Sequence, residues 1–250
     1  MAHVLEITGL HKRFGGIVVA DDIVLSIATG QILGLIGPNG AGKTSLFNLI
    51  SGVVKADTGV IRLNGERIDR MAVHGRARTG LSRTWQHIRL FPSLTILENL
   101  LVAPRHSPDE TPLAGLLPGT ADARQQIHER ALAQLAKVKM LDAADRFPSE
   151  LSYGKQKLIS IARALMNDGN CLLLDEPMAG VEGPAYDAIK GLVRDEAAAG
   201  RAICVVEHNI SFVRDLCDSA VFMFNGRIMA RGTVEDLVRN PDLTELYFGA

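Results

Sequence analysis

The sequence predicts an α/β fold in which a core of strands and helices is interrupted by a helical insertion. Two observations lead to this prediction. Short β-type runs fill the opening third of the chain, and strands and helices alternate in its last part, while the middle has a helical pattern. The chain has 250 residues, of which 47% are hydrophobic, so it can bury a sizeable core. An intrinsically disordered protein is therefore excluded.

The opening third is expected to be rich in strands. Short β-type runs are predicted at residues 4–8, 17–20, 23–27, 60–63 and 81–85. Residues 31–36 form a continuous apolar run that predicts a buried strand ending at Gly37, and residues 43–51 predict a helix. The pair Asn64-Gly65 is a turn signal directly after one of the strands.

The middle of the chain changes character. Residues 96–103 have a helical pattern, and residues 121–140 predict a long amphipathic helix. Four prolines between these segments indicate a loop: Pro104, Pro108, Pro112 and Pro118. We therefore expect an inserted helical subdomain.

Strand and helix alternate in the last part. Helices are expected at residues 155–166, from Pro184 onward and at residues 210–216, with strands at residues 171–174 and 202–206. A hairpin over residues 220–230 is expected to turn at Asn225-Gly226.

The charge balance gives no broad electrostatic field. Lys and Arg number 27 against 28 for Asp and Glu, a formal net charge of −1, so any polyanion must be bound locally. Arg76, Arg78, Arg83 and Arg89 are scattered and have no aromatic platform. We interpret these arginines as a solvated face and expect no nucleic-acid partner.

No part of the sequence resembles a targeting or membrane segment. The first residues lack the features of a secretory signal, and no stretch approaches the ~18 apolar residues of a membrane span, so a cytoplasmic location is expected. Cys171 and Cys204 lie in apolar runs, Cys217 lies in an amphipathic stretch, and their spacing is not that of metal ligands. We expect reduced, buried structural thiols.

A phosphate-binding pattern follows the strand that ends at residue 36. It reads Gly37-Pro38-Asn39-Gly40-Ala41-Gly42-Lys43-Thr44 and continues into Ser45. Glycines between a strand and a helix let backbone N–H groups converge on phosphate oxygens, and the helix N-terminus adds partial positive charge. We expect Lys43 to serve the β- and γ-phosphates of a nucleotide and Thr44 to ligate Mg²⁺.

A second motif places two carboxylates at the end of an apolar strand. Asp175 and Glu176 follow the run Cys171-Leu-Leu-Leu, and a metal-dependent NTPase needs two such groups at the edge of its sheet. Asp175 is expected to support the Mg²⁺ shell, and Glu176 is expected to orient and polarise the attacking water. The guanine-reading pattern Asn-Lys-x-Asp is absent from the sequence, which counts against a GTPase.

A third motif opens a helix. In Leu151-Ser152-Tyr153-Gly154-Lys155, Ser152 is a natural N-cap, Gly154 leaves the backbone open to an incoming group, and such a helix start can bind an anion. With these three motifs in this order, the chain from about Leu5 onward resembles the ATP-binding subunit of ATP-binding cassette (ABC) transporters, whose signature is Leu-Ser-Gly-Gly-Gln.

The resemblance implies one ABC ATPase domain over residues 1–250, with ATP and Mg²⁺ as cofactors. Residues 1–86 and 167–250 would form the P-loop NTPase core with an N-terminal antiparallel β subdomain, and residues 87–166 would form an α-helical subdomain that carries the signature.

The resemblance also assigns roles to single residues. It places Phe14 against adenine, and it makes Gln86 the glutamine that touches Mg²⁺ and the attacking water and links the site to the membrane partner. His208 matches the histidine that contacts the γ-phosphate. Family members enclose two ATP molecules between two head-to-tail subunits, so Ser152 and Gly154 of one copy should complete the phosphate site of the other. The second subunit can be another copy or a related ATPase.

Three departures from the family pattern bear on these contacts between subunits. Tyr153 replaces the first glycine of the signature and Lys155 replaces its glutamine. Residues 178–182, Met-Ala-Gly-Val-Glu, stand where the family commonly has a loop ending in Leu-Asp.

Residues 83–91 and 94–103, the proline-rich insertion and the tail at residues 240–249 are similar to the first ATP-binding subunit of the bacterial branched-chain amino-acid importers. This similarity implies integral-membrane permease partners, a periplasmic solute-binding protein acting indirectly, and a position at the inner face of the cell membrane. Residues 85–91 are then expected to form a groove for a cytoplasmic helix of the permease. One alternative is the ATPase of the lipopolysaccharide export system, which shares the Ala179-Gly180-Val181 type of loop. Another is a soluble ABC ATPase without a permease.

Overall fold

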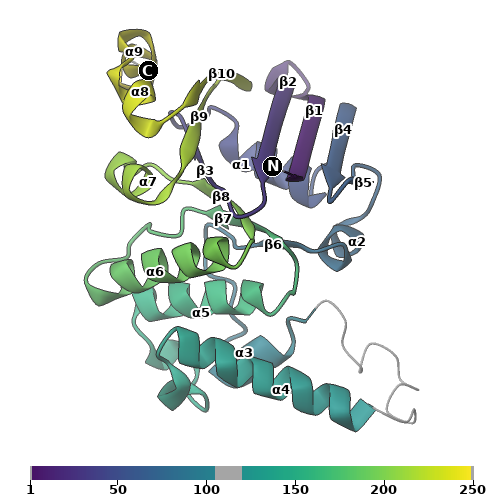
Figure 1. Ribbon diagram of the computed structural model, residues 1–250, viewed down its shortest axis with the longest axis vertical. Coiled ribbons are helices and arrows are strands. Elements are labelled where there is room, and N and C mark those ends of the chain that lie inside the picture. The colour runs from purple at the N-terminus through teal and green to yellow at the C-terminus, as the bar shows by residue number, and fades with distance from the viewer. Residues whose placement is uncertain (1, 105–119, 249–250) are drawn as a thin grey trace.

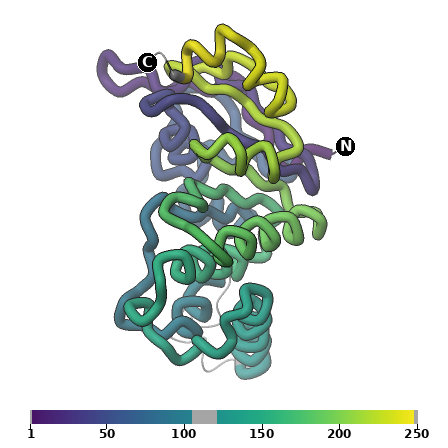
Figure 2. Tube along the Cα trace, turned by 90° about the vertical axis from the view of Figure 1, so that its left-hand side faces the viewer, coloured from purple at the N-terminus to yellow at the C-terminus, as the bar shows by residue number. Residues whose placement is uncertain are grey.

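The computed structural model describes residues 2–104 and 120–248. Two sheets lie side by side in the upper half of the molecule, and helices fill its lower half (Figure 1). The side view separates the same two parts, with both termini in the part that contains the sheets (Figure 2). Of the four prolines predicted to mark a loop, Pro104 is described, while Pro108, Pro112 and Pro118 lie outside the described residues.

The first sheet has four strands in the order β2-β1-β4-β5, all antiparallel. The strands are β1 (His3–Phe14), β2 (Ile17–Ala28), β4 (Thr58–Leu63) and β5 (Glu66–Arg67). Residues 17–20 and 23–27 were predicted as separate runs, but they form the single strand β2. The register shifts where Asp22, with φ of 53°, interrupts the alternation. A bulge of this kind lets one strand pass through two polar residues.

The second sheet has six strands in the order β10-β9-β3-β8-β7-β6. They are β3 (Ile32–Ile36), β6 (Leu81–Arg83), β7 (Cys171–Asp175), β8 (Ala202–Val206), β9 (Ser219–Phe224) and β10 (Arg227–Gly232). All neighbours are parallel except β9 and β10, which form the predicted hairpin. Asn225 and Gly226 at its turn have φ of 46° and 77°, as a type I′ turn requires.

Both faces of the six-stranded sheet are covered. Leu172 and Leu174 of β7 belong to the apolar cluster that includes the helices below, whereas Cys171 and Leu173 belong to the cluster shared with the first sheet. Successive side chains of a strand point to opposite faces, so a strand covered on both faces reads as an unbroken apolar run. This explains why the sequence identified β7 and β8 so clearly.

The helices are α1 (Lys43–Ser51), α2 (Val73–Arg78), α3 (Ile96–Leu101), α4 (Thr120–Lys137), α5 (Tyr153–Leu165), α6 (Pro184–Ala198), α7 (Ile210–Leu216), α8 (Val234–Arg239) and α9 (Pro241–Phe248). Helices α3 to α6 form the lower half in Figure 1, and α8 and α9 pack beside β9 and β10. Among the described residues, no helix combines the length and the apolar character that crossing a bilayer requires.

Two predictions about side chains have different outcomes. Cys171, Cys204 and Cys217 are unpaired thiols, and the prediction that they are buried is confirmed for Cys171 and Cys204, whereas the Cys217 side chain is half-buried. Burial raises the pKa of Cys171 and of Cys217 to about 12. The interpretation of the arginines as a solvated face is wrong for Arg76, which is 2% exposed, and for Arg83, whose side chain is 6% exposed. Both fill buried positions because carbonyl or carboxylate oxygens surround their guanidinium groups.

Candidate nucleotide site

The parallel order of the second sheet brings the sequence motifs to one edge. Strands β3, β6, β7 and β8 are parallel neighbours or near neighbours, and their carboxyl ends lead into the phosphate loop, Gln86, Glu176 and His208 respectively. Ligands of open α/β sheets bind beyond this edge. Four segments that are far apart in the sequence therefore meet at one site.

The phosphate loop, residues 37–45, joins β3 to α1 and depends on its glycines. Gly37 has φ of 149°, and a Cβ there would lie 2.1 Å from the carbonyl oxygen of Met223. Gly42 has φ of 104°, and a Cβ there would lie 2.6 Å from the carbonyl oxygen of Val19. A side chain at either position would require the backbone to move, so the sequence is restricted to glycine here.

Lys43 is held at the mouth of this loop. Its side chain is largely buried, and its Nζ donates hydrogen bonds to the carbonyl oxygens of Gly37 at 2.7 Å and Pro38 at 2.9 Å. Burial lowers the pKa of Lys43, and the charges of Glu176 and Asp175 oppose that shift. Thr44 is exposed and Ser45 is half-buried in the first turn of α1, which contains no acidic residue to neutralise the positive end of the helix.

Asp175 ends β7 and is 1% exposed. Its Oδ2 accepts a hydrogen bond of 2.9 Å from Arg83 Nη2, whereas its Oδ1 has no hydrogen-bond partner among the described residues. Burial raises the pKa of Asp175, and the Arg83 guanidinium opposes that shift. A buried carboxylate oxygen without a partner is costly unless a cation occupies the space beside it.

Glu176 directly follows Asp175, and each of its carboxylate oxygens has a side-chain partner. Gln86 Nε2 donates to Oε2 at 2.9 Å, and His208 Nε2 lies 2.8 Å from Oε1. Glu176 has φ of 47°, an uncommon conformation for a residue with a side chain and one that occurs often at functional sites. The structure thus brings together three of the residues that the sequence nominated.

No cluster of three or more His, Cys, Asp or Glu side chains suited to a metal ion occurs in residues 2–104 and 120–248. Mg²⁺ does not need such a cluster, because it is commonly bound by one or two carboxylates together with substrate phosphates and waters. The single partnerless oxygen of Asp175 beside the phosphate loop fits that pattern.

Phe14 lies at the end of β1, opposite Ile17 in the β1–β2 pairing, and is 48% exposed. The Lys12 ammonium lies 5.1 Å from the centre of the Phe14 ring. Strand β2 approaches the phosphate loop through Val19, two residues after Ile17. An exposed ring on this strand pair suits stacking on a base better than packing in a core.

Ser152 and Gly154 lie at the start of α5, as predicted. Ser152 occupies the N-cap position and is exposed, and its hydroxyl makes no capping bond to the described backbone. Gly154 has a second reason to be glycine, because a Cβ there would lie 3.0 Å from the Cβ of Ala185 on α6. A pocket of about 1060 Å³ borders both residues, and within the described chain no residue of the phosphate loop lines it.

Tyr153 of the signature lies against residue 180, which belongs to the loop that departs from the family pattern. Gly180 has φ of 70°, and a Cβ there would lie 3.1 Å from the Tyr153 ring. The tyrosine at the start of α5 therefore covers the place that a side chain at position 180 would use. The Tyr153 ring and the glycine at position 180 therefore pack together.

Three residues of the site were missed by the sequence analysis. Arg83 joins β6 to Asp175 and also donates to Asn48 Oδ1 at 2.8 Å and Ser51 Oγ at 2.9 Å on α1. Glu207 is 3% exposed and accepts a hydrogen bond of 2.7 Å from the backbone N–H of Met178. Burial raises the pKa of Glu207. The third residue is Lys157 on α5. The available signal for Glu207 was its position directly after the apolar strand β8, whereas Arg83 ends the short strand β6, whose sequence Leu-Ser-Arg gave no such signal.

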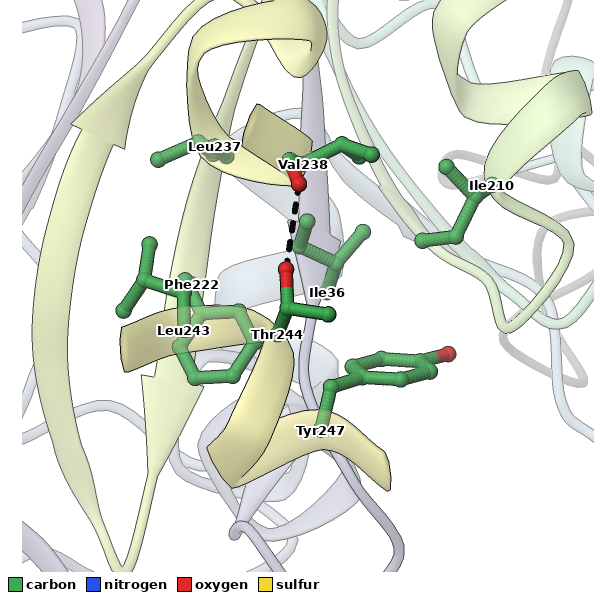
Figure 3. Close-up of a pocket in the computed structure, with 8 residues that line it drawn as sticks. All are labelled: Ile36, Ile210, Phe222, Leu237, Val238, Leu243, Thr244 and Tyr247. Atoms are coloured by element: carbon green, nitrogen blue, oxygen red, sulfur yellow. Dashed lines mark hydrogen bonds between the residues drawn. The ribbon is translucent and has the colours of Figure 1, made fainter. Parts of the chain in front are cut away.

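A smaller pocket lies among helices α7, α8 and α9 and the second sheet, and its lining residues come from these helices and from β3 and β9 (Figure 3). It encloses about 170 Å³ and is almost entirely apolar, with Ile36, Phe222 and Leu243 among its walls. The Thr244 hydroxyl there donates to the carbonyl oxygen of Val238 at 3.0 Å. Such a space is too small and too apolar for a nucleotide. The Tyr247 hydroxyl at its edge donates instead to the carbonyl oxygen of His208 at 3.2 Å.

Comparisons with known proteins agree with this geometry. The ABC transporter family matches residues 20–179. The high-affinity branched-chain amino acid transport ATP-binding protein BraF of Pseudomonas aeruginosa is 36% identical over 249 residues, 98% of each chain. Its counterpart LivG of Escherichia coli K12 is 35% identical over 249 residues, 98% of this chain and 97% of LivG. The lipopolysaccharide export system ATP-binding protein LptB of Haemophilus influenzae is 32% identical over 246 residues, 98% of this chain and 97% of LptB.

Solved structures of ATP-binding cassettes share the whole fold. A nucleotide-free cassette from an ABC transporter matches with a TM-score of 0.87 at 31% identity and covers 100% of both chains. The ADP conformation of the cassette MJ1267 matches with a TM-score of 0.86 at 30% identity, again over 100% of both chains. With the family match, these likenesses show that the chain belongs to the ABC transporter family as an ATP-binding, ATP-hydrolysing subunit.

Proposed function

We propose that this chain supplies the ATPase of an importer for branched-chain or related amino acids. The support is the likeness to BraF and LivG, named as branched-chain amino acid transport proteins, over nearly the whole chain. LptB is 32% identical, so the lipopolysaccharide export ATPase is the second candidate. A soluble ABC ATPase without a permease is the third.

Nucleotide binding is assigned to the phosphate loop and to Phe14. Backbone N–H groups of residues 37–45 would surround the phosphates, and Lys43 would turn its ammonium from the loop carbonyls to the β- and γ-phosphates. The exposed ring of Phe14 would stack on adenine. Mg²⁺ would be held by Thr44, Gln86 and Asp175, where it supplies charge neutralisation at the phosphates.

Hydrolysis is assigned to Glu176. The observation that supports this assignment is that Gln86 and His208 each contact one oxygen of its carboxylate. A carboxylate fixed beside the phosphate loop can orient a water molecule and accept its proton as the water attacks the γ-phosphorus. Gln86 would touch both the metal and the water, and His208 would contact the γ-phosphate. Their bonds to Glu176 keep all three side chains within reach of one reacting group.

The permease partner is assigned to a groove of about 510 Å³ between the second sheet and the lower helices. The Trp85 ring in its wall has the Arg83 guanidinium 4.4 Å from the ring centre and the Arg89 guanidinium 4.0 Å from it. Phe91 and Val102 add apolar surface. A groove with an aromatic wall and the exposed cation of Arg89 at its edge suits an amphipathic helix, and we therefore assign the subunit to the inner face of the cell membrane. The solute-binding protein would act only through the permease.

The test of this assignment is Glu176→Gln, which keeps the shape of the side chain and removes its charge. Nucleotide affinity should be retained while ATP turnover falls by about 10²–10⁴, the usual scale for losing a positioned base. Calorimetric titration and steady-state ATPase assays separate the two effects. Near wild-type turnover in the presence of the permease would move the role of base away from Glu176.

The transport assignment is tested separately. A tagged copy of the chain, purified from membranes with mild detergent, should bring with it permease subunits that support ATP-dependent leucine uptake in vesicles. Recovery of lipopolysaccharide exporter subunits, or of no membrane protein, would favour the second or third candidate.

A further inference from the structure

Lys157 lies five residues after Ser152 on α5 and is 3% exposed. Its Nζ donates to the backbone carbonyl oxygen of Gln86 at 2.9 Å and to that of Glu176 at 3.0 Å. These are the same two residues whose side chains bond to each other at 2.9 Å. One buried ammonium therefore joins the backbones of the loops after β6 and β7.

Burial and nearby carboxylates act on Lys157 in opposite directions. Burial lowers the pKa of Lys157 below its ordinary value, and the negative charges of Glu207, Glu176 and Asp175 oppose that shift only in part. A buried ammonium is tolerated when carbonyl oxygens and carboxylates replace its water. Within residues 2–104 and 120–248, both hydrogen bonds of the Lys157 ammonium go to these loops, so its position depends on where they lie.

Helix α5 holds the groove segment at a second point. Arg163, six residues after Lys157, donates from Nη1 to the carbonyl oxygen of Arg89, and its guanidinium lies 4.8 Å from the centre of the Phe91 ring. The two cations of α5 thus fasten residues 86–91 near both ends. Of these two side chains, Lys157 also donates a hydrogen bond to the backbone of Glu176.

The backbone of Glu176 needs such support because its φ of 47° is unfavourable for a residue with a side chain. The carbonyl oxygen of Glu176 also accepts a longer hydrogen bond, of 3.3 Å, from the backbone N–H of Ala179. If it lost the shorter bond from Lys157, the peptide could relax toward an ordinary conformation. The carboxylate would then leave the position where Gln86 and His208 hold it.

We propose that Lys157 is a positioning residue for ATP hydrolysis, which ties the Gln86 loop to Glu176 so that a displacement of residues 86–91 reaches the carboxylate. This inference rests on the proposed role of Glu176. It goes beyond that role, because it names the connection between the groove and the reacting group.

The test compares Lys157→Met, which keeps the length of the side chain, with Lys157→Arg, which keeps the charge and donors. Lys157→Met should lower kcat about tenfold or more while KM and nucleotide affinity stay within about threefold. Lys157→Arg should restore kcat to within about threefold of wild type. Lys190→Met is the matched control, since Lys190 lies on α6 beside Asp215 at 3.6 Å, and it should leave kcat unchanged.

A second readout follows the loop itself. Trp85 precedes Gln86 and is the single tryptophan of the chain, so its fluorescence reports on this segment. Acrylamide should quench Trp85 more strongly in Lys157→Met than in wild type or in Lys190→Met.

Three results would overturn the inference: unchanged kcat in Lys157→Met, a parallel loss of nucleotide affinity and thermal stability that Lys157→Arg does not rescue, or unchanged quenching. Glu176→Gln is measured in the same assay. Full activity of Glu176→Gln would refute the proposed role of Glu176 and, with it, this inference. An inactive Glu176→Gln beside an active Lys157→Met would refute the inference alone.

Discussion

At the scale of single residues, we expect the phosphate site to depend strongly on the charge of Lys43. Its ammonium is buried at the mouth of the loop and has carbonyl oxygens as its partners. Exchanging those oxygens for phosphate oxygens converts neutral acceptors into charged ones, and such hydrogen bonds are about twice as strong.

Lys43→Ala should therefore weaken nucleotide binding by about 1.5–3 kcal/mol, or roughly 10- to 150-fold in the dissociation constant. A calorimetric titration with ATP and Mg²⁺ measures this loss. Lys55→Ala is the control, because Lys55 is an exposed lysine outside the loop. Equal affinities of wild type and Lys43→Ala would show that the phosphates bind elsewhere.

The residues that the sequence could identify share a local signature. The phosphate loop has fixed spacing, and Asp175, Glu176 and His208 come at the end of, or just after, apolar strands. Lys157 has no such signature, because it acts on backbone carbonyl oxygens and any chain supplies those. Arg83 was misread for a related reason. Its partners lie on α1 and β7, which the sequence alone does not place beside it.

At the scale of secondary-structure elements, the end of α1 is completed by an arginine from α2. Arg76 Nη1 donates to the carbonyl oxygens of Leu49 at 2.6 Å and Ile50 at 2.8 Å, and Nη2 donates to that of Asp69 at 2.9 Å. The last carbonyl groups of a helix have no partners within it, so this side chain replaces the missing donors.

Arg76→Met keeps much of the buried volume and removes every donor. Each buried polar group left without a partner costs roughly 1–3 kcal/mol, so the free energy of unfolding should fall by at least about 2 kcal/mol. Urea unfolding followed by circular dichroism measures the change. Arg70→Met alters an exposed arginine nearby and should stay within about 0.5 kcal/mol of wild type. A similarly small effect for Arg76→Met would mean that water satisfies these carbonyl groups.

Element boundaries show where sequence reasoning stops. The periodicity predicted β7, β8 and the hairpin of β9 and β10, because each is an apolar run or carries a turn signal. It divided β2 at Asp21-Asp22, since two adjacent polar residues break the alternation, while in the structure a bulge carries the strand through them.

At the scale of the whole molecule, the order of strands could not be read from local pattern. Strand β6 precedes the helical insertion in the sequence, yet it pairs with β7, which follows that insertion. This pairing brings Gln86 to Glu176 across 90 positions of the sequence. The sequence indicated that both residues belong to a site, and the sheet topology explains how they meet.

The start of α5 carries an exposed surface that is separate from the phosphate loop of the same chain. Ser152 is exposed at the N-cap without a capping bond to the described backbone, and the pocket beside it includes no described residue of the phosphate loop. A helix N-terminus of this kind attracts anions. Because its own phosphate loop is not part of that pocket, we expect the phosphates to come from the nucleotide of a second subunit.

Glu176→Gln should therefore associate when ATP is added, because blocked hydrolysis keeps the shared nucleotide in place. Sedimentation at high protein concentration should shift from the 27.0 kDa monomer toward about 54 kDa, which is twice that mass. ADP should not produce this shift, because it lacks the γ-phosphate. Adding Ser152→Glu to the same chain should abolish the shift, since a carboxylate at the N-cap repels the incoming phosphates. If ATP leaves Glu176→Gln monomeric, two copies of this chain do not share their sites, and the working dimer requires a related ATPase as the second subunit.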